Sequence, residues 1–339
     1  MVETQAYYLT KKGNASQAFS LRTCQLPSLN PSQVLIEVEA FGLNYADVMA
    51  RKGLYKEAPP MPCVLGYEVV GVVKSVGNDV YASLVNQRVV AFCRFGGYAK
   101  HVITDARALC VINDMQASTA LALATQYVTA YYMVEFASRV GTSDRVLIHA
   151  AAGGVGTALI QLCKLKNAYV IAKVSSEAKR EFVQKLGADQ TIIYTETPYE
   201  RAISFPIEIS FNPVAGSTFK KDWKLLQAGG RLVLFGGSEL ANGKWGLLSK
   251  LNFVKKMGVI IPIGLMMGSK SLMGVNMLKI ADAKPEILAQ CLSEVVKLTQ
   301  EGRINPISGG VFSSKELAKA HELLEKGETI GKLTIFWDE

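Results

Sequence analysis

The chain has 339 residues, of which 49% are hydrophobic and 19% are charged, with a net charge of +8. This length and composition provide enough apolar residues for about two folded domains with large cores, so a disordered chain is not expected. The lysines and arginines are dispersed, and the Lys-Lys runs at 11–12, 220–221 and 255–256 are only pairs. We therefore expect no DNA partner.

The cysteines and apolar runs indicate where the protein works. The six cysteines form no CxxC pair, which predicts neither a disulfide framework nor a structural zinc site and favours reduced thiols. The N-terminus, MVETQAYYLTKKGN, lacks the apolar core of a signal peptide. The run at 257–268, MGVIIPIGLMMG, is short for a membrane span and contains a proline. We expect a cytoplasmic protein with no transmembrane segment.

Residues 1–120 are predicted to be rich in β-strands. The segment VLIEVEAFGL (34–43) places Glu37 and Glu39 on one face of a strand. Three further runs, separated by Gly, Asn and Asp turns, are predicted strands: YEVVGVVKSVG (67–77), RVVAF (88–92) and GGYAKHVIT (96–104). This pattern is typical of a partly open β-barrel.

Strands and helices alternate from about residue 120 onward. A helix is predicted over 118–137, and the elements that follow are a strand at 145–150, a helix at 154–166, a strand at 168–174, a helix at 176–187, strands at 191–194 and 206–212, a helix within 216–230 and a strand at 231–237. Such βαβ alternation predicts a doubly wound parallel sheet in an α/β fold. Helices at 285–302 and 314–328 and a strand at 332–337 complete the chain.

The segment LIHAAAGGVG at 147–156 follows a predicted strand and opens a predicted helix. It matches the dinucleotide pattern GxGxxG with Ala151 in the first position, followed by Gly153 and Gly156. A turn without side chains lets a pyrophosphate approach the backbone, and the helix N-terminus adds its positive dipole. We expect the cofactor to contact Ala152, Gly153, Gly154, Val155 and Gly156.

The end of the next strand indicates which dinucleotide binds. NAD sites usually place a carboxylate there, but Ser175 and Ser176 follow the strand, and Lys179 comes one helical turn later. Hydroxyls, a helix N-terminus and a cation suit a 2′-phosphate, so we predict NADPH.

Later strands of a parallel sheet also end at the cofactor crevice. We expect Tyr194 to flank the adenine. We also expect Asn212, at the end of the following strand, to contact the cofactor. The last strand tip is predicted to border the ribose and nicotinamide with Phe235, Gly236, Gly237 and Ser238.

The order of these features resembles the medium-chain dehydrogenase/reductase superfamily over nearly the whole chain. NYADVMARKGLY (44–55), LGYEVVGVVKSVG (65–77), TAYYM (129–133) and IHAAAGGVG are similar to its zinc-independent quinone oxidoreductase, or zeta-crystallin-like, branch. NYADVMARKGLY and the C-terminal half are especially similar to the vesicle amine transport protein homologue subgroup. The resemblance implies a GroES-like barrel domain of residues 1–122 and 268–339 and a Rossmann domain of residues 123–267.

Zinc-dependent members of the superfamily carry Gly-His-Glu where this chain has Gly66, Tyr67 and Glu68. Tyrosine is a poor replacement for an imidazole ligand, and FGLNYADV lacks the expected cysteine. We predict no metal, and we expect Glu68 to be a structural carboxylate, paired with an arginine.

Without a metal, reduction of an electron-poor acceptor needs only hydrogen bonds to the developing oxyanion. The resemblance implies that Asn44, Tyr55 and Thr129 line the pocket for the nicotinamide and the acceptor, with Asp47 capping or orienting. It also implies that a loop with Gly331 and Lys332 returns toward the nicotinamide, where Lys332 reaches either a phosphate or water.

The resemblance further implies a homodimer joined through an edge strand, for which VIIPIG (259–264) is the candidate; a buried strand within one monomer is the alternative. The leading function is an NADPH-dependent quinone reductase. Two alternatives remain: a reductase of activated double bonds in alkenals or enoyl thioesters, and an NADPH-binding regulatory protein associated with RNA or lipid and with little turnover.

Overall fold

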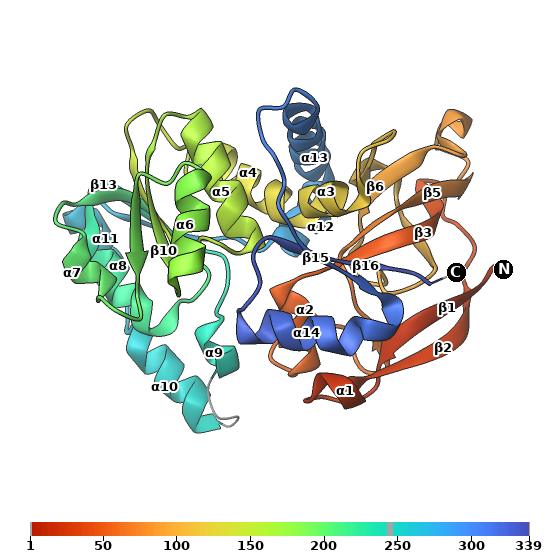
Figure 1. Cartoon of the computed structure of the whole chain (residues 1–339), viewed down its shortest axis with the longest axis horizontal. Coiled ribbons are helices and arrows are strands. Elements are labelled where there is room, and N and C mark those ends of the chain that lie inside the picture. Colours follow the sequence, from red (N-terminus) through yellow and green to blue (C-terminus); the bar gives the residue numbers. More distant parts are fainter. Residues whose placement is uncertain (1, 243–246, 339) are drawn as a thin grey trace. The chain divides into compact units, whose positions relative to one another are not determined.

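The computed structural model describes residues 2–242 and 247–338. They form two compact units (Figure 1). Unit 1 comprises Met1–Val128 and Leu278–Glu339, and unit 2 comprises Thr129–Met277. The sequence placed the corresponding boundaries at 122/123 and 267/268.

Unit 1 is built on two antiparallel-rich sheets. The larger has the order β15-β16-β3-β5-β6-β8, with β7 also paired to β3, and the smaller has the order β2-β1-β4. The strands are β1 (Val2–Leu9), β2 (Phe19–Leu26), β3 (Gln33–Leu43), β4 (Cys63–Val64), β5 (Glu68–Val76), β6 (Arg88–Phe92), β7 (His101–Asp105), β8 (Leu109–Val111), β15 (Ser308–Ser313) and β16 (Lys332–Phe336). The predicted β-rich first part of the chain is confirmed.

The longest strand of unit 1, β3, shows why these residues form a sheet. Its apolar side chains, such as Ile36 and Phe41, are fully buried, whereas Glu37 and Glu39 face solvent. The last strand, β16, pairs with β3, so the C-terminus of the chain completes the sheet begun near its N-terminus. The helices of this unit are α1 (Ala15–Ala18), α2 (Tyr45–Arg51), α3 (Ala117–Ala122), α13 (Pro285–Gln300) and α14 (Leu317–Lys326), with α12 (Met277–Ala283) at its boundary.

Unit 2 is a doubly wound parallel sheet, as predicted. Its strand order is β11-β10-β9-β12-β13-β14, and every pair is parallel. The strands are β9 (Arg145–Ile148), β10 (Tyr169–Val174), β11 (Gln190–Ile193), β12 (Ile207–Asn212), β13 (Leu226–Leu234) and β14 (Ser271–Gly274).

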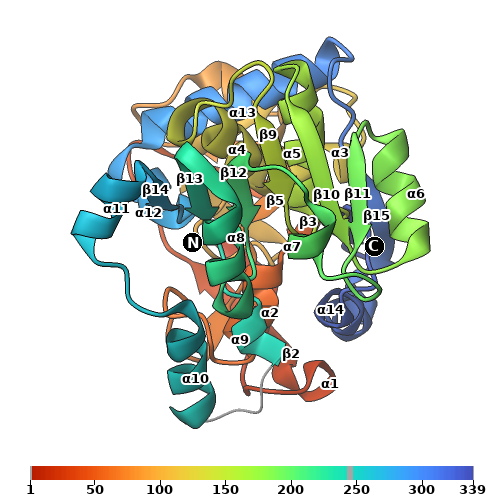
Figure 2. The ribbon, with the colours of Figure 1, turned by 90° about the vertical axis from the view of Figure 1, so that its left-hand side faces the viewer.

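Helices cover both faces of this sheet, with α5 and α6 on one side and α7 and α8 on the other (Figures 1 and 2). The helices of unit 2 are α4 (Val128–Tyr131), which begins at the boundary, α5 (Gly154–Leu165), α6 (Glu177–Lys185), α7 (Tyr199–Ala202), α8 (Phe219–Leu225), α9 (Glu239–Asn242), α10 (Leu247–Met257) and α11 (Pro262–Gly268). Buried apolar side chains of β9, β10, α7 and α8 form the core between the sheet and one helical layer.

The prediction of an edge strand at 259–264 is wrong. Residues 258–261 are irregular, and Pro262 starts α11. A proline suits the first position of a helix, where its missing N–H is not needed, and this outweighs the β-branched character of the run. Beyond β13, the sheet edge is β14 instead.

The segment Leu251–Gly268 is apolar enough, by length and composition, to cross a membrane, and none of it is buried. The structure divides it into the end of α10, an irregular stretch and α11. The expected absence of a transmembrane segment therefore stays a prediction.

Candidate cofactor and acceptor sites

The glycine-rich segment forms the turn between β9 and α5. Gly156 is its closest approach, because a Cβ atom there would lie only 2.4 Å from the Ala150 carbonyl oxygen. Gly153, where a Cβ would lie 3.2 Å from the same oxygen, is the N-cap of α5 and offers no side chain to cap it. The N-terminus of this twelve-residue helix therefore has no side-chain cap.

This turn fits a dinucleotide pyrophosphate. The backbone N–H groups of Gly154 and Val155 lie in the first turn of α5, where helix N–H groups lack intrahelical acceptors. Ala152, just before the turn, is buried and adds only a methyl group. An anion is favoured at such a position by the free donors and by the helix dipole.

The end of β10 offers a second uncapped helix start. Ser176 is the exposed N-cap of α6, but its hydroxyl does not cap the helix. Ser175 lies just before it, and Lys179 is half-buried in the first turn of α6. Two hydroxyls and a cation therefore lie within a few residues of one strand end, which suits a phosphate monoester.

Tyr194 follows β11 and is 47% exposed. Its backbone N–H donates to Val174, which ties it to the end of β10, and its ring lies 4.7 Å from the Lys173 ammonium. An exposed aromatic ring at this strand tip is a suitable platform for an adenine.

The tips of β12 and β13 are joined by backbone hydrogen bonds. Phe235 donates to the Asn212 carbonyl and Ser238 to the Pro213 carbonyl. Gly236 is required there, because a Cβ would lie 2.8 Å from the Pro213 carbonyl oxygen. Gly237 follows in the same irregular segment, so the four residues 235–238 form one short loop.

The expectation that Asn212 contacts the cofactor needs correction for its side chain. Asn212 is fully buried, and its side-chain oxygen accepts from the backbone N–H groups of Val214 and Ala215. Its amide donates to Thr218 and Asp222. These bonds shape the turn after β12 and leave the side chain inside the protein.

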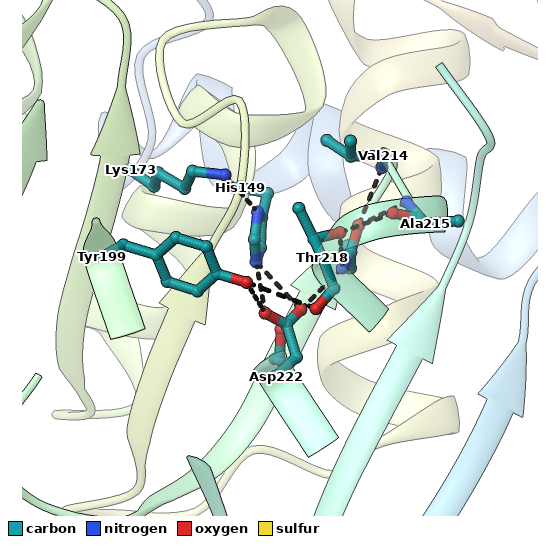
Figure 3. Close-up of polar contacts among 9 residues, drawn as sticks. His149, Lys173, Tyr199, Val214, Ala215, Thr218 and Asp222 are labelled. Carbon is teal, nitrogen blue, oxygen red and sulfur yellow. Dashed lines mark hydrogen bonds and ion pairs between the residues drawn. The ribbon is translucent and has the colours of Figure 1, made fainter. Parts of the chain in front are cut away.

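A buried polar network includes His149, the residue just before the glycine-rich turn (Figure 3). His149, directly after β9, contacts Asp222 of α8 at 3.0 Å through Nε2 and Lys173 of β10 at 3.2 Å through Nδ1. Asp222 also accepts from the hydroxyls of Tyr199, at 2.6 Å, and Ser210, at 2.8 Å. This network links β9, β10, β12, α7 and α8, and so fixes the start of the glycine turn.

The charges in this network follow from its burial. Burial lowers the pKa of His149, and the nearby Asp222 only partly offsets this, so a neutral imidazole is favoured. Burial alone would raise the pKa of Asp222, but His149 and the surrounding donors outweigh it and lower the pKa. Burial lowers the pKa of Lys173 to about 8.

This network was not predicted from the sequence. The available signals were a histidine at the end of an apolar strand and a lysine within the next one. Neither signal identifies Asp222 as the partner, because it lies 73 residues from His149.

A second buried network holds Asn44 in unit 1. Asn44 is the N-cap of α2, and its backbone N–H donates to Asp47 at 2.9 Å, which confirms the expected capping role of Asp47. The Asn44 side-chain amide donates to both oxygens of Glu68, at 2.9 and 2.8 Å, and its oxygen accepts from Lys332 at 3.0 Å. Thr125 and Lys332 also bond Glu68 directly.

The position of Lys332 therefore differs from the prediction that its side chain reaches a phosphate or water. Its side chain is fully buried, and its ammonium is paired with Glu68. The partner of Glu68 is accordingly this lysine and not an arginine. Gly331, just before it, has a φ of +68°, and a Cβ there would lie 2.4 Å from the Ile307 carbonyl oxygen, so the glycine serves a tight turn within unit 1.

Tyr55 and Tyr67 of unit 1 form an aromatic pair. Tyr55 is half-buried on the loop after α2, and its ring stands edge-on to Tyr67, with centroids 6.4 Å apart. Burial raises the pKa of both phenols, so both are protonated at neutral pH. Asn44 and Tyr55 belong to unit 1, and Thr129, which is buried, is the first residue of unit 2.

The residues around Glu68 do not fit a zinc ion. Among the described residues, no group of three or more His, Cys, Asp and Glu side chains is close enough to hold a metal. Glu68 is paired with an ammonium, and burial raises the pKa of the Cys93 thiol, which disfavours the thiolate that zinc requires.

Comparisons with known proteins agree with this architecture. Residues 30–133 match the family described as alcohol dehydrogenase GroES-like domain, and residues 186–335 match the zinc-binding dehydrogenase family. The chain is 30% identical to the synaptic vesicle membrane protein VAT-1 homolog of Danio rerio, over 91% of this chain and 65% of that protein. It thus spans about two thirds of that relative's length.

Two further relatives are matched along their whole length. The chain is 29% identical to a probable quinone oxidoreductase of Schizosaccharomyces pombe, covering 97% of this chain and 96% of that one. The crystal structure of Escherichia coli quinone oxidoreductase complexed with NADPH superposes with a TM-score of 0.83 at 25% identity, covering 98% of this chain and 99% of that chain.

Proposed function

Because the chain belongs to the medium-chain dehydrogenase/reductase superfamily, we propose that it is a metal-independent reductase that uses NADPH to transfer hydride to a quinone. The observation that carries this proposal is the uncapped α5 N-terminus behind Gly153 and Gly156, which fits a pyrophosphate. The similarity to the E. coli quinone oxidoreductase solved with NADPH supports the same cofactor.

Preference for NADPH over NADH rests on the strand end after β10. Ser175, Ser176 and Lys179 supply hydroxyls and a cation where an NAD site would place a carboxylate. A 2′-phosphate at this position would bond the hydroxyls and the uncapped N-terminus of α6. Tyr194 would stack against the adenine, and residues 235–238 would border the ribose and nicotinamide.

Bound NADPH supplies the hydride, and the side chains of this protein supply position and hydrogen bonds. We assign Asn44, Tyr55 and Thr129 to the pocket for the nicotinamide and the acceptor. The Asn44 side chain is held at both ends, because its amide nitrogen donates to the Glu68 carboxylate and its oxygen accepts from Lys332.

A quinone is the acceptor class that the local residues favour. The rings of Tyr55, Tyr67 and Phe95 pack against one another in unit 1, and aromatic side chains suit a planar ring. The S. pombe relative that bears the name probable quinone oxidoreductase matches over nearly its full length.

Location and assembly are further parts of the proposal. All six cysteines are free in the structure, which suits a reducing, cytoplasmic location. We assign the homodimer contact to the edge of β14 in place of residues 259–264, because β14 ends the sheet and is mostly exposed.

The proposal is tested by following the oxidation of NADPH with a panel of ortho- and para-quinones and a matched panel of alkenals. Turnover of quinones is expected. Turnover restricted to alkenals would replace the quinone with an activated double bond, and NADPH binding without turnover of either class would contradict the reductase assignment.

A further inference from the structure

Lys173 is a buried lysine in a strand of the parallel sheet of unit 2. It lies near the end of β10, and only 7% of the residue is exposed. Lysines are almost never buried in proteins unless a carboxylate pairs with them. Within the described part of the chain, no carboxylate lies within ion-pair distance of the Lys173 ammonium. The burial of this cation therefore needs a reason other than an ion pair.

The partners of the Lys173 ammonium are one imidazole and two aromatic rings. The ammonium lies 3.2 Å from Nδ1 of His149 (Figure 3), and 4.4 and 4.7 Å from the ring centroids of Tyr199 and Tyr194. Because Nε2 of His149 contacts Asp222, an imidazole protonated at Nε2 leaves Nδ1 to accept from the ammonium. The two rings attract the cation through the negative charge of their faces.

The two tyrosines differ in what else holds them. The hydroxyl of Tyr199 donates to Asp222 at 2.6 Å, and its ring stands edge-on to His149, with centroids 5.2 Å apart. The side chain of Tyr194, which is 47% exposed, makes no hydrogen bond and no ring contact with any described residue. The Lys173 ammonium is therefore the polar group that orients the Tyr194 ring.

The backbone of the same segment contacts the glycine-rich turn. The Lys173 carbonyl accepts from the N–H of Ala151 at 3.1 Å, and the next carbonyl, of Val174, accepts from the N–H of Tyr194 at 3.1 Å. Lys173 thus joins two parts of the assigned cofactor site, the turn for the pyrophosphate and the ring for the adenine.

We propose that Lys173 is a positioning residue for the cofactor, whose ammonium holds the Tyr194 ring as a platform for the adenine, so that nucleotide affinity depends on the protonation of Lys173. This proposal rests on the proposed function and adds to it a residue that acts through Tyr194. All the residues that carry it belong to unit 2.

The charge of Lys173 changes close to neutral pH. Burial lowers its pKa to about 8, and Lys221 adds to this effect, whereas Asp222, Glu200 and Glu239 oppose it. The ammonium is therefore present at neutral pH and is lost as the pH rises through about 8, so nucleotide affinity should fall over the same range. The titratable and charged groups that face Lys173 are His149 after β9, Tyr194 after β11, Tyr199 and Glu200 of α7, Lys221 and Asp222 of α8, and Glu239 of α9.

The first test is fluorescence titration of the protein with NADPH and NADH from about pH 7 to about pH 9.5, where the charges of both nucleotides are constant. Wild-type affinity for both should fall by about fivefold across this range, as expected for one lost cation–π contact. Lys173→Arg keeps a cation that does not titrate there, so its affinity should not change with pH. Lys173→Met should bind both nucleotides about fivefold more weakly at neutral pH and lose the pH dependence.

A double-mutant cycle tests whether Lys173 acts through Tyr194. Tyr194→Leu removes the ring, and adding Lys173→Met to that variant should cause no further loss of affinity. Lys270→Met is the matched control, because its ammonium lies 5.6 Å from the Trp223 ring centroid at the opposite edge of the sheet, and it should leave both affinities unchanged.

Two results would overturn the role of Lys173. One is an equal loss from Lys173→Met with and without Tyr194, which would show that the ammonium acts directly on the charge of the ligand. The other is the same pH profile for the wild type and Lys173→Arg, a comparison that suffices if Lys173→Met does not fold.

The two proposals can fail separately. Quinone turnover by a wild type whose nucleotide affinity does not depend on Lys173 would overturn this role and leave the reductase assignment intact. The expected pH profiles without turnover of any acceptor would support the role of Lys173 and overturn the reductase assignment. A wild type that binds neither nucleotide would overturn both.

Discussion

The side-chain amide of Asn44 donates to both carboxylate oxygens of Glu68, and Lys332 of the last strand pairs with the same carboxylate. These residues are 24 and 264 positions from Glu68 in the sequence. The C-terminal strand therefore completes the support of a residue near the N-terminus that we assign to the acceptor pocket.

Lys332→Met should destabilise the protein by about 3–5 kcal/mol, because it leaves the Glu68 carboxylate buried without its cation. Adding Glu68→Gln to the same chain should restore part of the loss, since the uncompensated charge is then removed. Urea unfolding measures both effects. A loss below about 1 kcal/mol for Lys332→Met would show that the pair is solvated, as surface pairs are.

Asp47 should make stability depend on pH. Burial, with the nearby Glu68 charge, raises the pKa of Asp47 to about 7, so the folded state holds a proton that the unfolded state has released. Stability from this group is present at low pH and is lost as the pH rises through the folded pKa. Relative to Asp47→Asn, the wild-type free energy of unfolding should fall by roughly 4 kcal/mol between about pH 4 and pH 8. Parallel pH profiles for the two proteins would refute this.

Asp222→Asn should lower the free energy of unfolding by about 3–5 kcal/mol, because Asp222 joins His149, Tyr199 and Ser210 in a buried network. Glu200→Gln is the matched control, since it removes a carboxylate from a partly exposed pair with Lys221 and should cost less than about 1 kcal/mol. Thermal or urea unfolding of both variants is the measurement, and equal losses would contradict the account.

Lys179→Ala should weaken NADPH binding by about tenfold or more and leave NADH binding unchanged, because only NADPH carries the 2′-phosphate. Lys185→Ala removes an exposed lysine from the other end of α6 and should change neither affinity. Fluorescence titration with both nucleotides distinguishes the cases. If Lys179→Ala weakened the binding of NADPH and NADH equally, the lysine would not contact the 2′-phosphate.

The parts of the fold that are determined by residues close together in the sequence could be predicted from it. The strand, turn and helix around Gly153 and Gly156 are one example, and the start of α6 at Ser176 is another. In both, the small or polar residues that define the turn lie within a few positions of one another.

The errors concern residues whose position depends on distant partners. Lys332 is buried because it forms an ion pair with the buried carboxylate of Glu68, which is distant in the sequence. The Asn212 side chain points inward because Asp222 and Thr218 accept its amide hydrogens. The run at 259–264 has the composition of a strand, but Pro262 begins a helix within it.

The central claim is tested most directly by the rate of NADPH oxidation with a para-quinone, measured for the wild type and for Gly156→Val. A Cβ at Gly156 would collide with the Ala150 carbonyl, so this variant should not bind the cofactor. The account predicts quinone-dependent oxidation by the wild type, faster with NADPH than with NADH, and none by the variant. Equal rates with the two proteins, or no quinone-dependent oxidation by the wild type, would contradict it.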